Sequence, residues 1–377
     1  MKKLTLTLET ITPLFLAGAD PEEGGELRPA SFRGQMRYWL RAILGAGHGI
    51  DQVRQIESRL FGAADQEIGA AKVSLTINGA LRFEPFKSVP SPVRDQVSGH
   101  DYLYWSMKGM GGKPNRAYAI PEQQFSITLR TRPGAQIQDS DFDQTTAALW
   151  LVLTLGGLGS RARRTGGSLR MLNAEGNATS LLFDTRAQNG SALCNEILNG
   201  LITVQKIAGK LATPTVDYDT LHPNVCRIWV LGGGQDWLTW QEAVKGIGEK
   251  LRDFRHLRKP DYADVKDAIQ GKSQTARVER VVFGLPLRFQ YRSLDRPNNN
   301  AWIAGKYERR ASPLHLKVAK LANGNYLGVA VLFKSAFLPK GEKLKAKNAR
   351  VSLPQDYTLI ESFIQTQFPN HWEVTGW

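Results

Sequence analysis

The sequence predicts an α+β protein with two ferredoxin-like (RRM-like) domains in tandem, both carrying insertions. With 377 residues, the chain exceeds what one compact core usually serves. Residues 3–174 show strand and helix patterns in the order strand, helix, strand, strand, helix, strand, which is the ferredoxin-like arrangement. The second half repeats this order less clearly. We therefore place an N-terminal domain at 1–185, with an insertion at about 80–123, and a C-terminal domain with helical insertions at 186–377.

The elements of the first half begin with a strand at residues 3–10, KLTLTLET, where Leu and Thr alternate with period two. A loop rich in proline and glycine follows, and Ser31 can act as the N-cap of a helix at about 32–45. The insertion, which contains YLYWSMKGMGGKPNR, is expected to project as a loop or hairpin. The other elements expected here are strands at 71–79 and 124–132, a helix at 143–157 and a strand at 168–174.

The second half starts with a connecting helix expected at 191–209. The pattern then predicts a strand at 226–233, a helix at 238–254, strands at 281–292, 312–320 and 325–337, and a helix at 356–368. A polar stretch separates the second of these helices from the next strand. A second ferredoxin-like domain with insertions accounts for this order.

The charge balance indicates a polyanionic partner. Lysine and arginine number 49 against 35 aspartates and glutamates, which gives a net charge of +14 and a sequence pI of about 9.7. A domain pI above about 9 is typical of nucleic-acid-binding proteins. The alternative is a generally basic soluble protein, because net charge reports on non-specific binding and not on fold.

Other protein classes are disfavoured. The two cysteines, Cys194 and Cys226, are too far apart for a CxxC zinc pattern and do not indicate a disulfide framework. The N-terminal segment lacks the continuous apolar core of a signal peptide, and no apolar run reaches the roughly 18 residues of a membrane span. We expect a cytoplasmic protein that has no membrane contact and no cofactor.

A stripe of arginines marks the first predicted helix, SFRGQMRYWLRA. Positions 33, 37 and 41 drift by only about 40° per step on a helix, so Arg33, Arg37 and Arg41 share one face. The neighbouring apolar face consists of Phe32, Met36, Trp39, Leu40 and Ile43. No acid lies between Leu27 and Ile50, and Arg28 adds a fourth arginine, so an external phosphate is the expected partner. Alternatively, one or two of these arginines bridge to acids elsewhere in the fold.

The second basic motif is GGLGSRARRTGGSLR, residues 156–170, which contains no acid. Its glycines allow close backbone approach and leave N–H groups for anions, and its arginines add charge. The motif lacks the spacing of a phosphate-binding Walker loop. It is interpreted as a loop that follows phosphates, with a flexible helix end as the alternative. The RNA-binding candidates in it are Gly156, Gly157, Gly159, Arg161, Arg163 and Arg164.

Further candidates lie outside these two motifs. Lys113 stands among glycines in the insertion, and Arg309 and Arg310 precede a predicted strand; plain surface charge is the alternative for all three. Four aromatic residues, Trp39, Tyr102, Tyr104 and Trp105, could stack on bases, although aromatic residues in such runs more often belong to the core.

The inventory for catalysis is poor. The six histidines are scattered and form no metal-binding spacing, so neither a metal site nor a catalytic residue is assigned. His48 and His315 lie near basic segments, and either could serve as a general base in metal-free RNA cleavage.

Three segments together resemble the RAMP superfamily of CRISPR proteins. They are ITPLFLAGA with ELRPASFRGQMRYWLRAIL, the loop GGLGSRARRTGGSL, and VVFGLPLRF with RRASPLHLKV. Within that superfamily, the chain is similar to the first subunits of type III-B (Cmr) effector complexes. The segments lie near the start, the middle and the last quarter of the chain, so the resemblance spans most of it.

The resemblance implies a non-catalytic RNA-binding subunit that holds the 3′ region of a guide CRISPR RNA and captures target RNA. Its partners would be the two RNAs and other RAMP subunits, and the arginines of both motifs would hold the RNA. Specificity would come from base pairing by the guide, so the protein groove would not read sequence. Two alternatives stay open: a RAMP endoribonuclease that processes guide precursors without metal, and a stand-alone RNA chaperone.

Overall fold

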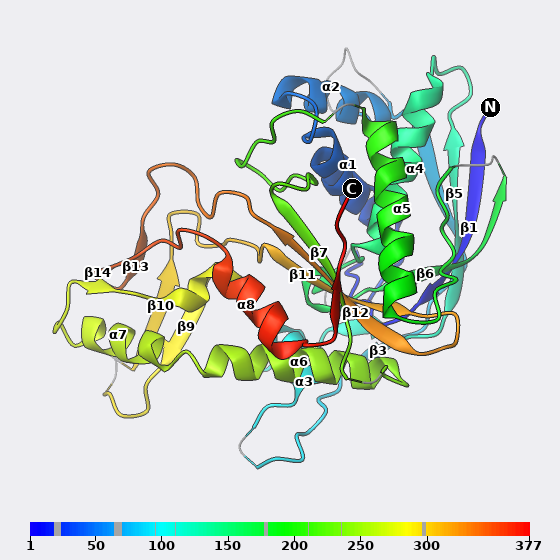
Figure 1. The fold of residues 1–377 in the computed structure, drawn as a ribbon. Helices are drawn as coiled ribbons and strands as arrows, with labels where there is room; N and C mark the ends of the chain where they lie inside the picture. Colours follow the sequence, from blue (N-terminus) through cyan, green and yellow to red (C-terminus); the bar gives the residue numbers. More distant parts are fainter. Residues whose placement is uncertain are drawn as a thin grey trace.

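The structure, a computed structural model, has a mixed α+β fold, which confirms the predicted class. The described residues are 1–18, 24–63, 70–94, 96–109, 111–176, 180–209, 211–234, 236–295 and 299–377. Figure 1 shows a main body that contains both termini and a smaller lobe that projects from one side. Within the described residues, no helix has the length and apolar character needed to cross a membrane.

The first sheet has the strand order β2-β5-β1-β6, and all neighbouring strands are antiparallel. In the central strand, Leu6 lies opposite Ile127 on one side and Ala174 on the other. The strands are β1 (Lys3–Thr10), β2 (Val73–Asn78), β5 (Gln124–Thr131) and β6 (Leu169–Gly176). The associated helices are α1 (Pro29–Leu44), α2 (Ile50–Phe61) and α4 (Asp139–Thr154). The elements expected in this half are therefore present, and α2 is an additional helix.

The start of α1 differs from the prediction. The helix begins at Pro29 after the extended residue Arg28, so Ser31 lies inside the helix and does not cap it. Proline suits this position because it lacks the N–H group that would have no partner in the first turn and its φ is already helical.

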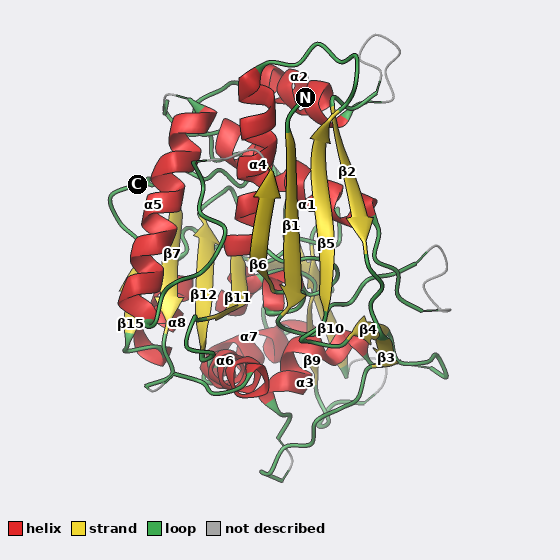
Figure 2. Cartoon of the chain, turned by 90° about the vertical axis from the view of Figure 1, so that its right-hand side faces the viewer, coloured by secondary structure: helices red, strands yellow, loops and turns green. Residues whose placement is uncertain are grey.

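The second sheet repeats the topology of the first. Its order is β11-β12-β7-β15, again with antiparallel neighbours. The strands are β7 (Cys226–Leu231), β11 (Leu314–Lys320), β12 (Tyr326–Phe333) and β15 (His371–Glu373). The helices of this part are α5 (Gly190–Ala208), α6 (Trp240–His256) and α8 (Thr358–Gln367). Figure 2 shows the two sheets side by side, and across their junction Val318 N donates to Ser168 Oγ at 3.2 Å.

The projecting lobe contains a third sheet, which the sequence analysis did not predict. Its order is β8-β14-β13-β10-β9. Its elements are α7 (Lys259–Ile269), β8 (Thr275–Ala276), the 3-10 helix η3 (Glu279–Phe283), β9 (Leu287–Gln290), β10 (Asn300–Ala304), β13 (Leu344–Ala346) and β14 (Ala349–Val351). The strand predicted at 281–292 is thus wrong. Gly284, with φ of 118°, and Pro286 interrupt it, and only its second part pairs, in this separate sheet.

The insertion of the first half docks on the second half. It contains the paired strands β3 (Phe83–Pro85) and β4 (Ala117–Ala119), together with α3 (Gly99–Tyr104) and the 3-10 helix η1 (Trp105–Met107). The hairpin was expected, but the docking was not. Helix α3 meets α6 through glycines: a Cβ on Gly99 would lie 2.0 Å from Lys245 O, and one on Gly248 would lie 2.1 Å from Gly99 O. The helices can approach this closely only because these Cβ atoms are missing.

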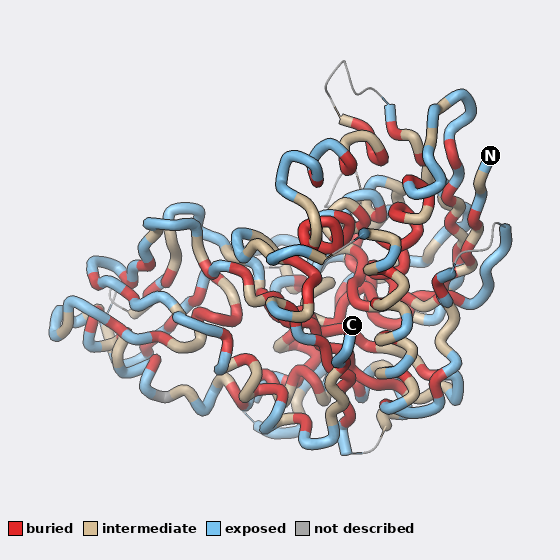
Figure 3. Tube along the Cα trace, turned by 45° about the horizontal axis from the view of Figure 1, so that its top comes forward, coloured by how far each residue is buried: buried red, intermediate tan, exposed pale blue. Residues whose placement is uncertain are grey.

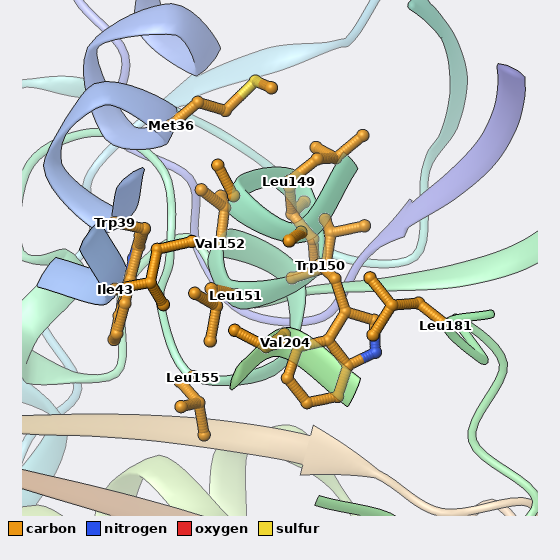
Figure 4. Close-up of a cluster of buried hydrophobic side chains, with 14 of the residues drawn as sticks. Met36, Trp39, Ile43, Leu149, Trp150, Leu151, Val152, Leu155, Leu181 and Val204 are labelled. Atoms are coloured by element: carbon orange, nitrogen blue, oxygen red, sulfur yellow. The ribbon is translucent and has the colours of Figure 1, made fainter. Parts of the chain in front are cut away.

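The hydrophobic core runs between α1, α4 and the two four-stranded sheets. Figure 3 shows that buried residues are concentrated in the main body. Figure 4 shows Met36, Trp39 and Ile43 of α1 facing residues of α4, with Val204 of α5 nearby. The same cluster continues to Val230 of β7. The apolar face predicted for α1 is therefore buried.

Candidate nucleic-acid interface

The glycine–arginine loop, residues 156–167, is a tightly bonded turn. Leu158 N and Gly167 O close it at 2.9 Å, and Thr165 N donates to Leu316 O of β11 at 2.7 Å. Gly167 has φ of 65°, and a Cβ there would lie 1.9 Å from Leu158 O, so only glycine fits. The loop is thus fixed between the first sheet and β11.

The N–H groups of this loop serve the loop itself. Those of Ser160, Gly166 and Gly167 donate to Phe15 O, Arg161 O and Pro13 O. The expectation that the glycines leave these groups for anions is therefore wrong for most of the loop. The glycines act by allowing close approach of the backbone, and the charged side chains of the loop are Arg161, Arg163 and Arg164.

These arginines open onto a cavity of about 1000 Å³. One wall is formed by Gly156, Gly157, Gly159 and Arg161–Arg164 of the loop and by Gln35, Tyr38 and Trp39 of α1. A second wall consists of Tyr102, Leu103, Trp105 and Ser106 of the insertion and of Arg252, Arg255 and His256 of α6. The third wall consists of Arg280, Phe283–Arg288, Trp302, Arg309–Ser312 and His315. The cavity therefore lies where the two halves of the chain and the projecting lobe meet.

The lining is strongly basic. Among the described residues that line the cavity, nine are arginines and none is a lysine, an aspartate or a glutamate. The nine are Arg161, Arg163, Arg164, Arg252, Arg255, Arg280, Arg288, Arg309 and Arg310, and the space they surround is called the arginine cavity. Within the described part of the chain, four of them form ion pairs and the other five do not. The five are Arg161, Arg164, Arg255, Arg288 and Arg309, and an anion that enters the cavity could form charge-assisted hydrogen bonds with them.

A single carboxylate supports two of the paired arginines. Arg163 Nη2 lies 3.5 Å from Asp219 Oδ2, and Arg310 Nη2 lies 3.9 Å from Asp219 Oδ1. Tyr38 Oη donates to Asp219 Oδ2 at 2.8 Å, and Ser335 Oγ donates to Oδ1 at 2.7 Å. The pKa of the Tyr38 hydroxyl is raised well above its usual value by burial and by the Asp219 charge, so this group stays a donor. Asp219 thereby fixes two arginines at the floor of the cavity.

Arg161 and Arg164 are half-buried. Arg164 donates to Leu314 O and Phe283 O, both at 3.1 Å. Burial and the neighbouring arginines lower the pKa of Arg164 to about 9, so it remains cationic at neutral pH. Burial also lowers the pKa of Arg161, whose Nε has no hydrogen-bond partner. Partly buried cations without an acid gain most from a phosphate that enters the cavity.

The arginine stripe of α1 does not join this cavity. Arg37 Nη1 and Arg41 Nη1 lie 3.2 and 3.0 Å from Glu57 Oε1 of α2, so these two arginines have a local acid. Arg37 Nη2 also donates to Phe61 O at 3.0 Å, at the end of α2. The prediction that the stripe lacks a counter-ion is wrong for both. Arg33 is exposed and has no ion pair within the described residues; with Arg37 and Arg132 it lines a separate hollow.

The remaining candidates also lie away from the arginine cavity or beneath it. Arg28 donates to Ala17 O at 3.2 Å and lies 3.7 Å from Glu26, and Lys113 is an exposed residue of the insertion. Trp39 is 1% exposed, and its ring packs on those of His315 and Phe333. The interpretation of Trp39 as a stacking surface is contradicted by this burial, because neither ring face is open to a base.

Four cavity arginines were missed, namely Arg252, Arg255, Arg280 and Arg288. Two of them have an acid as a neighbour: Arg252 pairs with Asp253, the next residue in the sequence, and Arg280 pairs with Asp261. A search for acid-free segments therefore passes over them. The spacing of three between Arg252 and Arg255 in the last turns of α6 was the available signal.

The two candidate histidines differ in position. His48 Nε2 lies 3.1 Å from Ala208 O, and His48 does not line the cavity. His315 does line it, but burial and the charges of Arg163 and Arg164 lower its pKa well below the usual value. Its Nε2 lies 3.4 Å from Tyr38 Oη. Within the described residues, no group of three His, Cys, Asp or Glu side chains could hold a metal ion.

Sequence comparison confirms the resemblance to the RAMP superfamily, whose family model matches residues 7–170. CRISPR system Cmr subunit Cmr1-1 of Pyrococcus furiosus is 25% identical over 344 residues, which are 88% of this chain and 88% of the relative. Subunit Cmr1-2 of the same organism is 29% identical over 185 residues, which are 45% of this chain and 96% of the relative.

Solved structures share the fold. The apo crystal structure of Cmr1 from Pyrococcus furiosus aligns with a TM-score of 0.61 at 21% identity, covering 100% of this chain and 99% of that chain. A subunit of the type III-B Cmr-beta complex, solved by cryo-EM bound to cognate target RNA, aligns with a TM-score of 0.58 at 11% identity. That alignment covers 97% of this chain and 98% of the other.

Proposed function

We propose that this chain is a non-catalytic RNA-binding subunit of a type III-B CRISPR ribonucleoprotein effector, and that its fold is a tandem of two ferredoxin-like units. In this proposal, the arginine cavity is the basic groove that holds the 3′ region of the guide RNA and captures target RNA. Other RAMP subunits of the effector are its protein partners. The relatives named above and the RNA-bound structural neighbour support this assignment.

The observation that carries the proposal is the lining of the cavity. Nine arginines surround it without one acid among the described lining residues, and five of them lack an ion pair. Arginine binds phosphate with two parallel hydrogen bonds and also stacks on bases, so a lining of arginine alone suits RNA better than small anions. Such contacts are independent of sequence, as required when the guide supplies specificity by base pairing.

The test is RNA binding as a function of salt. The cavity variant carries Arg161→Gln, Arg288→Gln and Arg309→Gln, and the control variant carries Arg33→Gln, Arg132→Gln and Arg54→Gln. Both lose three positive charges, but the control residues lie outside the cavity. We expect the cavity variant to lose about 2 units of the slope of log K against log salt, at roughly 0.7 per single-strand phosphate contact. The control variant should keep the slope.

Equal losses in the two variants would contradict the proposal, because net charge alone would then explain binding. Circular dichroism and thermal unfolding of both variants establish that the comparison is made on folded protein. The same experiment is repeated within the assembled effector, where the cavity variant should release target RNA faster than the control.

The endoribonuclease alternative has one supporting observation, the position of His315 in the lining of the cavity. The gels used for binding also report cleavage. RNA that remains intact with the wild type, in the absence of metal, supports the non-catalytic role. Cleavage that disappears in a His315→Ala variant, while binding persists, would instead support the enzyme.

A further inference from the structure

Two tryptophans expose half of their surface, and both line the arginine cavity. Trp105 is 51% exposed and Trp302 is 53% exposed. The other tryptophans within the described residues are buried or half-buried. An exposed indole is unfavourable in water, so two of them at one basic site indicate a ligand with flat apolar faces.

The two rings stand on different walls and on ordered elements. Trp105 begins η1 directly after α3, which is locked to α6 through Gly99 and Gly248. Trp302 lies in β10 directly opposite Arg288 of β9, and the Arg288 guanidinium is 5.7 Å from the indole ring. Each tryptophan is therefore held by secondary structure, and Trp302 forms one surface with a cavity arginine.

Phosphate contacts alone do not need these rings. A duplex keeps the faces of its bases stacked on one another, so it can offer an indole only its ends. Unpaired nucleotides expose every base face, and aromatic side chains beside a basic channel hold such strands without reading their sequence.

We propose that Trp105 and Trp302 are base-stacking residues, and that the arginine cavity takes single-stranded RNA with unpaired bases rather than a continuous guide–target duplex. This inference rests on the proposed function, because the arginines supply the phosphate contacts. It assigns unpaired strand ends or flanks to this cavity.

The test compares three RNAs: a single strand, a blunt duplex of the same sequence, and a single strand of the same length whose bases are removed. The variants are Trp105→Ala and Trp302→Ala, with Tyr307→Ala as the control. Tyr307 is 65% exposed and does not line the cavity. Because all three residues are exposed, their replacement is not expected to unfold the protein, and thermal unfolding checks this.

We expect each tryptophan variant to bind the single strand roughly 5- to 150-fold more weakly, from about 1–3 kcal/mol of stacking per base. Binding of the abasic strand and of the duplex should not change, and the salt slope should stay that of the wild type. The conservative changes Trp105→Phe and Trp302→Phe should recover part of the affinity, because a smaller ring still stacks.

Two failures can be told apart. If the arginine cavity variant binds like its control, the proposed function fails. If the arginine variant loses binding but the tryptophan variants bind the single strand as the wild type does, or lose the duplex and the abasic strand equally, only the stacking inference is overturned.

Discussion

The α1 stripe and the glycine–arginine loop that lines the arginine cavity look alike in sequence but differ in their counter-ions. Both are acid-free, arginine-rich segments in the first half of the chain. In the fold, Glu57 reaches Arg37 and Arg41, whereas Arg161 and Arg164 have no acid partner within the described residues. An arginine cluster therefore identifies an anion site only when the acids brought by distant elements are known as well.

The acids of the two clusters also differ in which arginines they contact. Asp219 takes two of the cavity arginines, Arg163 and Arg310, whereas Arg161 and Arg164 beside them have no ion pair within the described residues. Glu57 lies between the arginines that it neutralises. In the proposed function, the first arrangement positions charge for RNA, whereas the second fastens α2 to α1.

Removing Asp219 should damage the cavity and the fold together. In Asp219→Ala, Arg163 and Arg310 lose their carboxylate while remaining mostly buried, and Tyr38 loses its acceptor. Leaving buried charges without a partner costs about 3 to 5 kcal/mol of unfolding free energy. Urea unfolding measures this loss. A loss below about 1 kcal/mol, the level of a surface ion pair, would show that Asp219 does not support the cavity.

Removing Glu57 should reduce stability but leave RNA binding intact. In Glu57→Gln, the Arg37 and Arg41 contacts to a mostly buried carboxylate are weakened. Because both arginines are partly exposed and water screens them, we expect a loss of about 1 to 2 kcal/mol in unfolding free energy. Salt-dependent RNA binding is the second measurement. A steeper slope in Glu57→Gln would mean that freed stripe arginines reach RNA, which would remove the distinction between the clusters.

Most strands of the two four-stranded sheets could be predicted from the sequence because they run for six to eight residues with a local apolar pattern, as in β1. The three-residue strand β15 was not predicted. The third sheet could not be predicted in this way. β8 has two residues and β13 and β14 have three each, too few for a period to be visible. These strands exist because the lobe brings them together, and that information is not local.

The site was also only partly predictable, because some of its residues are visible as local sequence patterns and others are brought together by distant elements. The arginines of the loop stand out because no acid lies near them in sequence, and Arg309 and Arg310 stand out as a pair. Arg255 reaches the cavity on α6, and Trp105 is brought there by the docking of α3 on α6 through glycines far apart in sequence. Glu57 neutralises the stripe through the packing of α2, a helix whose presence was not predicted.

The buried Lys317, which bonds to the cavity loop, should make the unfolding free energy depend on pH. Lys317 Nζ donates to Gly156 O at 3.2 Å and to Leu169 O at 3.3 Å, and burial lowers its pKa from 10.5 to about 7. Between these two values the unfolded chain binds more protons at Lys317 than the folded chain does. Unfolding free energy therefore rises with pH in this window, by at most about 1.4 kcal/mol per pH unit.

The control for this effect is Lys317→Met, which keeps the length of the side chain but cannot titrate. The difference in unfolding free energy between wild type and variant isolates Lys317, because all other groups are shared. It should shift in favour of the wild type as pH rises from 7 towards 10.5. A difference that is flat over this window would show that the ammonium is not disfavoured by burial.

One exposed arginine from each cluster can be compared by its contribution to the salt dependence of RNA binding. Arg309 lines the cavity and Arg33 belongs to the stripe; neither has an ion pair within the described residues. Arg309→Gln and Arg33→Gln remove the same charge, so any difference reports position. We expect Arg309→Gln to lower the salt slope for single-stranded RNA by roughly 0.7 and Arg33→Gln to leave it unchanged. If Arg33→Gln lowers it equally, RNA continues from the cavity over the hollow beside α1, and the two clusters form one path in spite of Glu57.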